Sequence, residues 1–328
     1  MSEYRKRIAD TLLEERLEAV GAVLIEGPKA CGKTTTAEQL ARSVLYMDDP
    51  TSIGQNLQLA QTNVKRLLQG NTPRLIDEWP MSLQKKSRKA ALRQATEYFE
   101  AIIHSDISRV DGIARNEFRA KRLMRSYARL QGAMASVPTI VEDMKSNEPE
   151  VMSDETVTSY IKALKKIFVI EDMPAWNPNL RSKTAIRTGE TRYFVDPSLA
   201  VAALGIGPND LLNDLETMGL FFETLCVRDL RVFADVLDGE VYHYRDKSGL
   251  ECDTVVHLRN GSYGLIEIKL GGEKLIDDGV KALTALSEKI DTEKMKAPAF
   301  KMVLTAVGRF AYRRQDGIYV VPAGCLKD

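Results

Sequence analysis

The feature that most constrains this chain is a glycine-bounded stretch near its N-terminus, Gly27-Pro28-Lys29-Ala30-Cys31-Gly32-Lys33-Thr34. It has the form Gly-x-x-x-x-Gly-Lys-Thr, in which backbone amides surround phosphate groups at the N-terminus of a helix. The lysine adds a positive charge, and the threonine hydroxyl is a magnesium ligand. With Thr35 contacting the α-phosphate, the stretch predicts a loop that binds ATP and Mg²⁺. The alternative is an ordinary glycine-rich turn.

The flanking sequence has the alternation of strands and helices that a parallel sheet requires. A short apolar run at 22–25 predicts a buried strand, and further strands are expected at 44–47 and 75–76. Helices are expected at 4–19 and 34–43. Asp77 and Glu78 follow the third strand, so we expect Asp77 to hold Mg²⁺ with Thr34 and Glu78 to act as the base that orients an attacking water.

The middle of the chain is basic and helical. Residues 81–131 hold twelve Lys or Arg against five Asp or Glu, in a chain whose net charge is zero. At 100° per residue, five arginines fall within an arc of roughly 120°, opposite an apolar face; they are Arg115, Arg119, Arg122, Arg125 and Arg129. This arginine stripe predicts contact with DNA or an acidic protein partner, unless it is simply a solvated face.

Residues 138–176 predict helices at 139–145 and 153–166, followed by a strand at 168–170. Residues 177–190 are expected to form a loop or wing. Helix, loop, helix and strand hairpin is the order of a winged helix, a module that binds DNA or docks proteins.

The C-terminal part predicts a helix at 215–232, strands at 240–244, 253–258 and 265–268, a helix at 279–289 and a strand at 301–305. Asp253 begins one strand, Glu267 and Lys269 lie on the next, and Glu223 lies on the preceding helix. Carboxylates gathered on one side of a small sheet can hold magnesium, and a lysine there can stabilise charge on a phosphate. The sequence therefore predicts a nuclease-like catalytic site of these four residues, with Asp253 and Glu267 as Mg²⁺ ligands. Ordinary exposed strand charges are the alternative.

Together these motifs resemble prokaryotic AAA-type ATPases whose C-terminal part is the domain of unknown function (DUF) 4143. The resemblance rests on residues 24–36, 73–79, 106–112, 125–129, 244–249, Asp253 and 266–269. It implies an AAA-type nucleotide-binding module, a winged-helix region and a restriction-endonuclease-like C-terminal domain.

The chain departs from this family after Glu78. In the family, further strands, a sensor residue and an arginine finger follow, whereas here Pro80 to Leu83 lead directly into helix. A sheet of three strands in about 80 residues buries little surface. We therefore expect nucleotide binding to persist, while the missing segment argues against hydrolysis.

The remaining composition excludes several functions. The cysteines (Cys31, Cys226, Cys252, Cys325) and histidines (His104, His243, His257) are scattered, which argues against a structural zinc site and a disulfide framework. No apolar run approaches the roughly 18 residues of a membrane span, and the first residues are polar and lack the apolar core expected of a signal peptide. We expect a cytoplasmic protein, and an oligomer remains open.

The sequence thus predicts a multidomain α/β chain: a truncated P-loop parallel-sheet module at 1–80, a helical and winged-helix region at 81–190, and a nuclease-like α/β domain at 191–328. The leading hypothesis is an ATP-binding protein, with or without hydrolysis. The alternatives are a magnesium-dependent DNA endonuclease and a non-catalytic protein that binds DNA or another partner.

Overall fold

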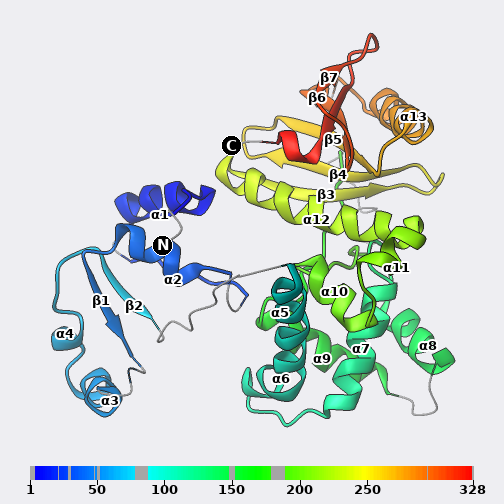
Figure 1. Cartoon of the computed structure of the whole chain (residues 1–328). Helices are drawn as coiled ribbons and strands as arrows, with labels where there is room; N and C mark the ends of the chain where they lie inside the picture. Colours follow the sequence, from blue (N-terminus) through cyan, green and yellow to red (C-terminus); the bar gives the residue numbers. More distant parts are fainter. Residues whose placement is uncertain are drawn as a thin grey trace. The chain divides into compact units, whose positions relative to one another are not determined.

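The computed structural model describes residues 4–20, 22–28, 31–47, 49, 52–77, 88–147, 152–178, 189–293 and 295–326. The chain forms two compact units, Met1–Lys86 and Ser87–Asp328. Each is a mixture of helices and strands (Figure 1).

The N-terminal unit is a small α/β module. Its elements in chain order are α1 (Ile8–Ala19), α2 (Lys33–Leu40), β1 (Ser43–Tyr46), α3 (Ile53–Thr62), α4 (Val64–Leu67) and β2 (Arg74–Asp77). Strands β1 and β2 are parallel, with Ser43 opposite Arg74 and Tyr46 opposite Asp77. The expected helices at 4–19 and 34–43 and the strands at 44–47 and 75–76 are therefore present, with shifted ends.

The expected strand at 22–25 is wrong. Within the described part of the chain, residues 22–28 pair with no strand, and Leu24 is 82% exposed. A strand is stable only where a neighbour satisfies its backbone N–H and C=O groups, and the apolar composition of this run cannot supply that neighbour. The parallel sheet therefore has two strands instead of three.

This module has a thin core. Of its described residues, the buried apolar side chains are Leu13, Ala37 and Leu67. Among the described residues, the three clusters of buried apolar side chains lie in the second unit. The expectation that so short a sheet buries little surface is confirmed.

The second unit begins with a helical half. Its elements are α5 (Arg88–Ala101), the π-helical turn η1 (Ile102–Asp106), α6 (Ile107–Arg109), α7 (Glu117–Arg129), α8 (Val137–Asn147), α9 (Asp154–Lys166), α10 (Pro197–Leu204) and α11 (Pro208–Asn213). One apolar cluster, which includes Phe99, Leu123, Tyr127, Ile140 and Leu164, joins α5, α7, α8 and α9.

The winged-helix expectation is met only in its helices. Helices α8 and α9 lie where the pattern places them, but the expected strand at 168–170 is replaced by isolated antiparallel bridges, Ile170 with Phe194 and Met173 with Thr191. Phe168 has a φ of 56°, which is incompatible with an extended strand through this position. Most of the expected wing, 179–188, lies outside the described residues.

The second half of this unit is a six-stranded sheet between two helices. Its elements are α12 (Leu215–Val236), β3 (Gly239–Arg245), β4 (Glu251–Leu258), β5 (Tyr263–Lys269), α13 (Glu273–Lys289), β6 (Phe300–Thr305), β7 (Tyr312–Arg313), β8 (Tyr319–Pro322) and the 3₁₀ turn η3 (Ala323–Cys325). The strand order is β3-β4-β5-β6-β8-β7. Strands β3 to β5 are antiparallel, β5, β6 and β8 are parallel, and β7 is antiparallel to β8.

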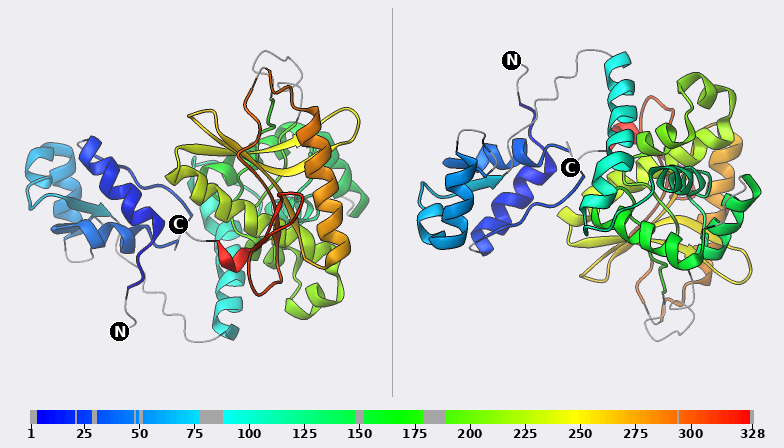
Figure 2. Two further views of the ribbon diagram at one scale, coloured as in Figure 1. Left: turned by 90° about the horizontal axis from the view of Figure 1, so that it is seen from above. Right: turned by 90° about the horizontal axis from the view of Figure 1, so that it is seen from below.

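Alternating side chains of the sheet supply two cores. On one face, Ile266 and Leu304 pack with Val227 and Leu230 of α12. On the other face, Leu265 and Val303 pack with Leu283 and Leu286 of α13. Figure 1 shows the two helices on opposite faces of the sheet and α12 between the sheet and the helical half; Figure 2 shows the same elements from above and from below. The expected helix–strand order is confirmed, with β7 and β8 added at one edge.

Candidate functional site

In the N-terminal unit, the predicted phosphate loop leads into a helix. Gly32 has a φ of 94°, a left-handed conformation that glycine adopts without strain, and α2 begins at the next residue. The Lys33 ammonium donates to the carbonyl oxygens of Gly27 at 3.0 Å and Pro28 at 2.8 Å. The cation therefore lies over the loop, beside the N-terminus of α2.

Thr34 and Asp77 meet although they are far apart in sequence. The Thr34 hydroxyl donates to Asp77 Oδ2 at 2.5 Å, because α2 and the end of β2 lie side by side. A hydroxyl and a carboxylate in contact are two oxygen ligands suited to Mg²⁺, which usually takes few ligands from the protein. Lys29, Ala30 and Glu78 lie outside the described residues, and no contact tests the expected role of Thr35.

Arg7 also lies at this loop, although no sequence pattern predicts it there. Its guanidinium donates to the carbonyl oxygen of Cys31 at 3.1 Å and lies where a side chain on Gly32 would stand. Arg7 and Lys33 thus place two cations at the loop. The contact depends on α1 packing against α2, which a local motif does not encode.

In the sheet domain, the predicted nuclease-like residues are brought together at the ends of β4 and β5. Lys269 Nζ lies 3.1 Å from Asp253 Oδ2 and 2.6 Å from Glu267 Oε2, so that both carboxylates share one ammonium. The backbone N–H of Ile268 also donates to Asp253 Oδ2 at 2.7 Å. Asp253 is thus fixed to the neighbouring strand beyond the last paired residues of β4 and β5.

Glu223 reaches this cluster from α12. Burial, together with the charge of Asp253, raises the pKa of its carboxyl to about 8. Burial and Asp253 likewise raise the pKa of Glu267 to about 8. Burial alone would lower the pKa of Lys269, but the charges of Asp253 and Glu267 outweigh it and raise this pKa. Three carboxylates around one ammonium attract either protons or a cation.

Sequence reasoning missed Tyr193, which completes the cluster. Its hydroxyl donates to Glu223 Oε1, and the residue is 1% exposed. Burial and the charge of Glu223 raise the pKa of Tyr193 well above its usual value, so the hydroxyl keeps its proton and remains a donor. Nothing in the pattern around Tyr193 distinguishes it from a core tyrosine.

The cluster fits a metal ion only through two side chains. Among the residues described, no three His, Cys, Asp or Glu side chains are arranged to hold a metal. Asp253 and Glu267 are the carboxylates in place, and Mg²⁺ is commonly held by one or two carboxylates while water supplies its other ligands. Their shared contact with Lys269 would then open.

The arginine stripe is not one exposed face, which corrects the expectation. The apolar side of α7 is buried as expected, but Arg115 lies before the helix and is buried, as is Arg122, whose guanidinium lies 5.6 Å from the Phe118 ring. Arg129 pairs with Asp143. Of the five, Arg125 is exposed and Arg119 half-buried. An arc of 120° is wide enough for its margins to meet neighbouring elements, which helical periodicity alone does not reveal.

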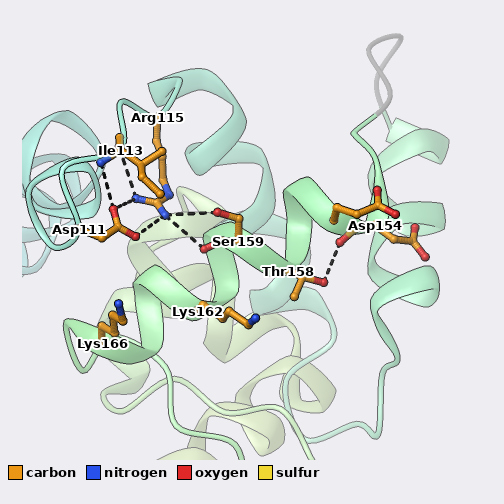
Figure 3. A pocket seen from close by; sticks show the side chains of 9 residues that line it. Asp111, Ile113, Arg115, Asp154, Thr158, Ser159, Lys162 and Lys166 are labelled. Carbon is orange, nitrogen blue, oxygen red and sulfur yellow. Dashed lines mark hydrogen bonds and ion pairs between the residues drawn. The ribbon is translucent and has the colours of Figure 1, made fainter.

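Arg115 instead forms the wall of a surface hollow of about 560 Å³ beside α9 (Figure 3). Its guanidinium donates to both carboxylate oxygens of Asp111, at 2.7 and 2.8 Å, and to the carbonyl oxygen of Ile107 at 2.7 Å. These hydrogen bonds lower the pKa of Asp111 to about 2. Asp154, Glu155, Lys162 and Lys166, all on α9, also line the hollow, so its lining is mixed in charge.

Residues 218–326, from α12 to the end of η3, match the family described as domain of unknown function (DUF4143). The chain contains a DUF4143 domain. The DUF4143 domain holds Glu223, Asp253, Glu267 and Lys269, whereas Tyr193 comes from outside it. This confirms the C-terminal part of the resemblance.

A second family model matches the end of β2 and the helical half. Residues 76–210 match the family described as domain of unknown function (DUF8612). Neither match covers the loop at 27–35, so the AAA-type part of the resemblance stays a prediction. No curated protein and no solved structure matches the chain. None of the described helices is long and apolar enough to cross a membrane.

Proposed function

We propose that the N-terminal unit binds a nucleoside triphosphate, ATP, together with Mg²⁺. The observation that carries this proposal is the contact between the Thr34 hydroxyl and Asp77 Oδ2. In P-loop proteins these two residue types hold the same magnesium ion, and their meeting across 43 residues is not required by the loop itself. The left-handed Gly32 and the two cations at the loop, Lys33 and Arg7, are consistent with a bound polyphosphate.

Each group at the loop would have its own role in binding the nucleotide. Backbone amides at the start of α2 would receive the phosphates, and Lys33 would exchange its contacts with Gly27 and Pro28 for phosphate oxygens. Thr34 and Asp77 would hold Mg²⁺, which neutralises phosphate charge when bound. Binding is proposed without hydrolysis, because the sequence that normally supplies a sensor residue is missing after Glu78.

Titration calorimetry with ATP and Mg²⁺ tests this proposal. Lys33→Ala should weaken binding at least tenfold, since a charge-assisted contact contributes about 1.5–3 kcal/mol. Lys65→Ala, which removes a lysine on α4 away from the loop, is the matched control and should bind as the wild type does. Absence of binding by the wild type, or equal binding by Lys33→Ala, would overturn the proposal. Phosphate release from the same samples separates an ATPase from a switch.

A second candidate function is magnesium-dependent cleavage of DNA in the DUF4143 domain. The observation that favours it is the shared Lys269, which bonds Asp253 and Glu267 on adjacent strands. Asp253 and Glu267 would hold Mg²⁺, Lys269 would stabilise negative charge on a phosphate, and Glu223 would hold a proton. A restriction-endonuclease-like fold for this sheet is part of the same proposal.

Incubation of labelled DNA with the full chain and Mg²⁺ tests this second function. Cleavage should disappear in Lys269→Ala and persist in Lys281→Ala, which removes a lysine with an exposed side chain on α13. Cleavage that survives Lys269→Ala would come from a contaminating enzyme, and the proposal would fall. Absence of cleavage by the wild type on single-stranded and duplex DNA would also contradict it.

A further inference from the structure

The outer edge of the six-stranded sheet carries aromatic and arginine side chains that face solvent. Phe310 is 68% exposed and Tyr312, on the edge strand β7, is 43% exposed; their ring centroids lie 6.2 Å apart. The Arg313 guanidinium lies 5.6 Å from the ring of Tyr319, which is also exposed. Arg309 is exposed beside Phe310. We call these five residues the edge strip.

The edge strip is positively charged. The neighbouring Arg314 is bonded to Asp277 and Asp316, each at 3.0 Å, so its charge is balanced. Arg309 and Arg313 form no ion pair with any residue that the structure describes. Arg313 does donate to the carbonyl oxygen of Gly317 at 3.3 Å, which orients its guanidinium without neutralising it. At this edge Phe310 and Tyr312 contact each other, whereas Arg313 and Tyr319 lie together on the other face of the sheet.

We propose that the edge strip binds single-stranded nucleic acid. Exposed rings stack on bases whatever their sequence, and interleaved arginines contact phosphates. A duplex hides the faces of its bases and offers the rings nothing to stack on. A large exposed aromatic surface is otherwise unfavourable, because water solvates it poorly and it promotes association with other molecules.

The strand register connects the edge strip to the candidate catalytic cluster. Tyr312 pairs with Val320, Val320 with Val303, and Val303 with Glu267. Residues paired in register face the same side of a sheet, and three strand spacings correspond to about 14 Å. Tyr312 and Glu267 therefore lie in one row on the same face of the sheet, and α13 covers this row at Val303.

The loop before β7 begins beside Lys269. The backbone N–H of Ala306 donates to the carbonyl oxygen of Lys269 at 3.3 Å, and Gly308 passes against the ring of Pro322. A nucleic-acid strand bound along the edge strip would therefore run toward the carboxyl ends of β5 and β6. The inference names the substrate class for the cleavage proposed above and rests on that proposal only in this respect.

Fluorescence anisotropy of a labelled oligothymidylate, titrated with the full chain in EDTA, tests the inference without cleavage. Phe310→Ala should weaken binding about fivefold to a hundredfold, since stacking on one ring contributes this much. Phe310→Trp keeps a stacking surface and should retain the affinity, whereas Phe310→Leu keeps only apolar area and should not. The double variant Arg309→Ala/Arg313→Ala should lower the salt dependence, with its logarithmic slope falling by about 1.4.

Arg245→Ala is the matched control, because Arg245 lies on β3 at the opposite edge of the same sheet and is similarly exposed. Its affinity should equal that of the wild type. Absence of wild-type binding, unchanged binding by Phe310→Ala, or equal binding of a duplex would overturn the inference. So would loss of binding in Arg119→Ala/Arg125→Ala alone, which would assign the nucleic acid to α7.

The two proposals fail in different ways. If the oligonucleotide binds through Phe310 but no DNA is cleaved with Mg²⁺, the inference stands and the catalytic proposal falls. If DNA is cleaved and Lys269→Ala abolishes the cleavage while edge-strip variants bind normally, the catalytic proposal stands and the inference falls.

Discussion

The hydroxyl of Tyr193 donates a hydrogen bond to the carboxyl of Glu223, thirty residues further along the chain. Tyr193 belongs to the segment that pairs with Ile170 and Met173, and it packs in the same apolar cluster as α12, the helix that carries Glu223. This buried hydrogen bond therefore joins a residue outside the DUF4143 domain to the candidate catalytic cluster within it.

Tyr193→Phe tests how much this hydrogen bond stabilises the protein. The substitution leaves the ring but removes the donor, and a buried carboxyl without its partner costs about 1–3 kcal/mol. Urea denaturation should show a loss of this size in the free energy of unfolding. Tyr242→Phe, which removes an exposed hydroxyl bonded to Glu240, should change it by less than about 0.5 kcal/mol. Equal losses in the two variants would contradict a special role for Tyr193.

Glu223 should make the folded state less stable as pH rises. Burial raises its pKa from 4.5 to about 8, so the folded protein keeps a proton that the unfolded chain has released. The stabilisation is complete below pH 4.5 and is lost as pH rises through about 8. While the folded chain alone holds the proton, the free energy of unfolding falls by up to about 1.4 kcal/mol per pH unit from this group.

Glu223→Gln is the matching variant, because glutamine has the same shape and still accepts from Tyr193. Its unfolding free energy, measured from pH 5 to 8, should fall less steeply than that of the wild type. Glu267 has a pKa shifted in the same direction, so some slope should remain. Identical slopes for variant and wild type would mean that Glu223 titrates near its ordinary pKa.

Asp172 should be essential to the stability of the helical half. Its side chain is 1% exposed and pairs with Arg192 and with Lys165, while Tyr127 donates to it. Asp172→Asn leaves the Arg192 charge without its partner in a largely buried setting, which costs about 3–5 kcal/mol. Thermal and chemical denaturation measure this loss. Glu190→Gln changes a more exposed acid in the same network and should cost less than about 1 kcal/mol.

Gly264 on β5 should not tolerate a side chain. A Cβ there would lie 2.1 Å from the ring of Phe300, its partner on β6. Gly264→Ala should therefore destabilise the protein by about 1–3 kcal/mol through overpacking. Gly219→Ala provides the contrast: this glycine lies within α12 with open space around it, so alanine should stabilise the helix by up to about 1 kcal/mol. If Phe300→Leu restores the stability of Gly264→Ala, the clash with the ring is the cause.

Much of the second unit follows from local pattern. The apolar face opposite the arginines at 115–129 and the pattern at 153–166 predict the helices observed as α7 and α9. The αβββαβ order of the sheet domain is predicted by the different apolar periodicity of its helices and strands. The convergence of Asp253, Glu267 and Lys269 also follows from their positions on adjacent strands. Strands β7 and β8 were missed because they are short and their partners lie far away in sequence.

The sequence by itself determined where the chain turns and which faces of its helices are apolar, because backbone preferences and side-chain periodicity act over a few residues. Tertiary structure decided the rest. Residues 22–25 have the composition of a strand, but among the described residues no strand pairs with them. Arginine is usually a surface residue, but Arg115 is buried against Asp111. Tyr193 became part of a site only by meeting Glu223. Pairing and burial depend on residues that are distant in sequence, and no local pattern records them.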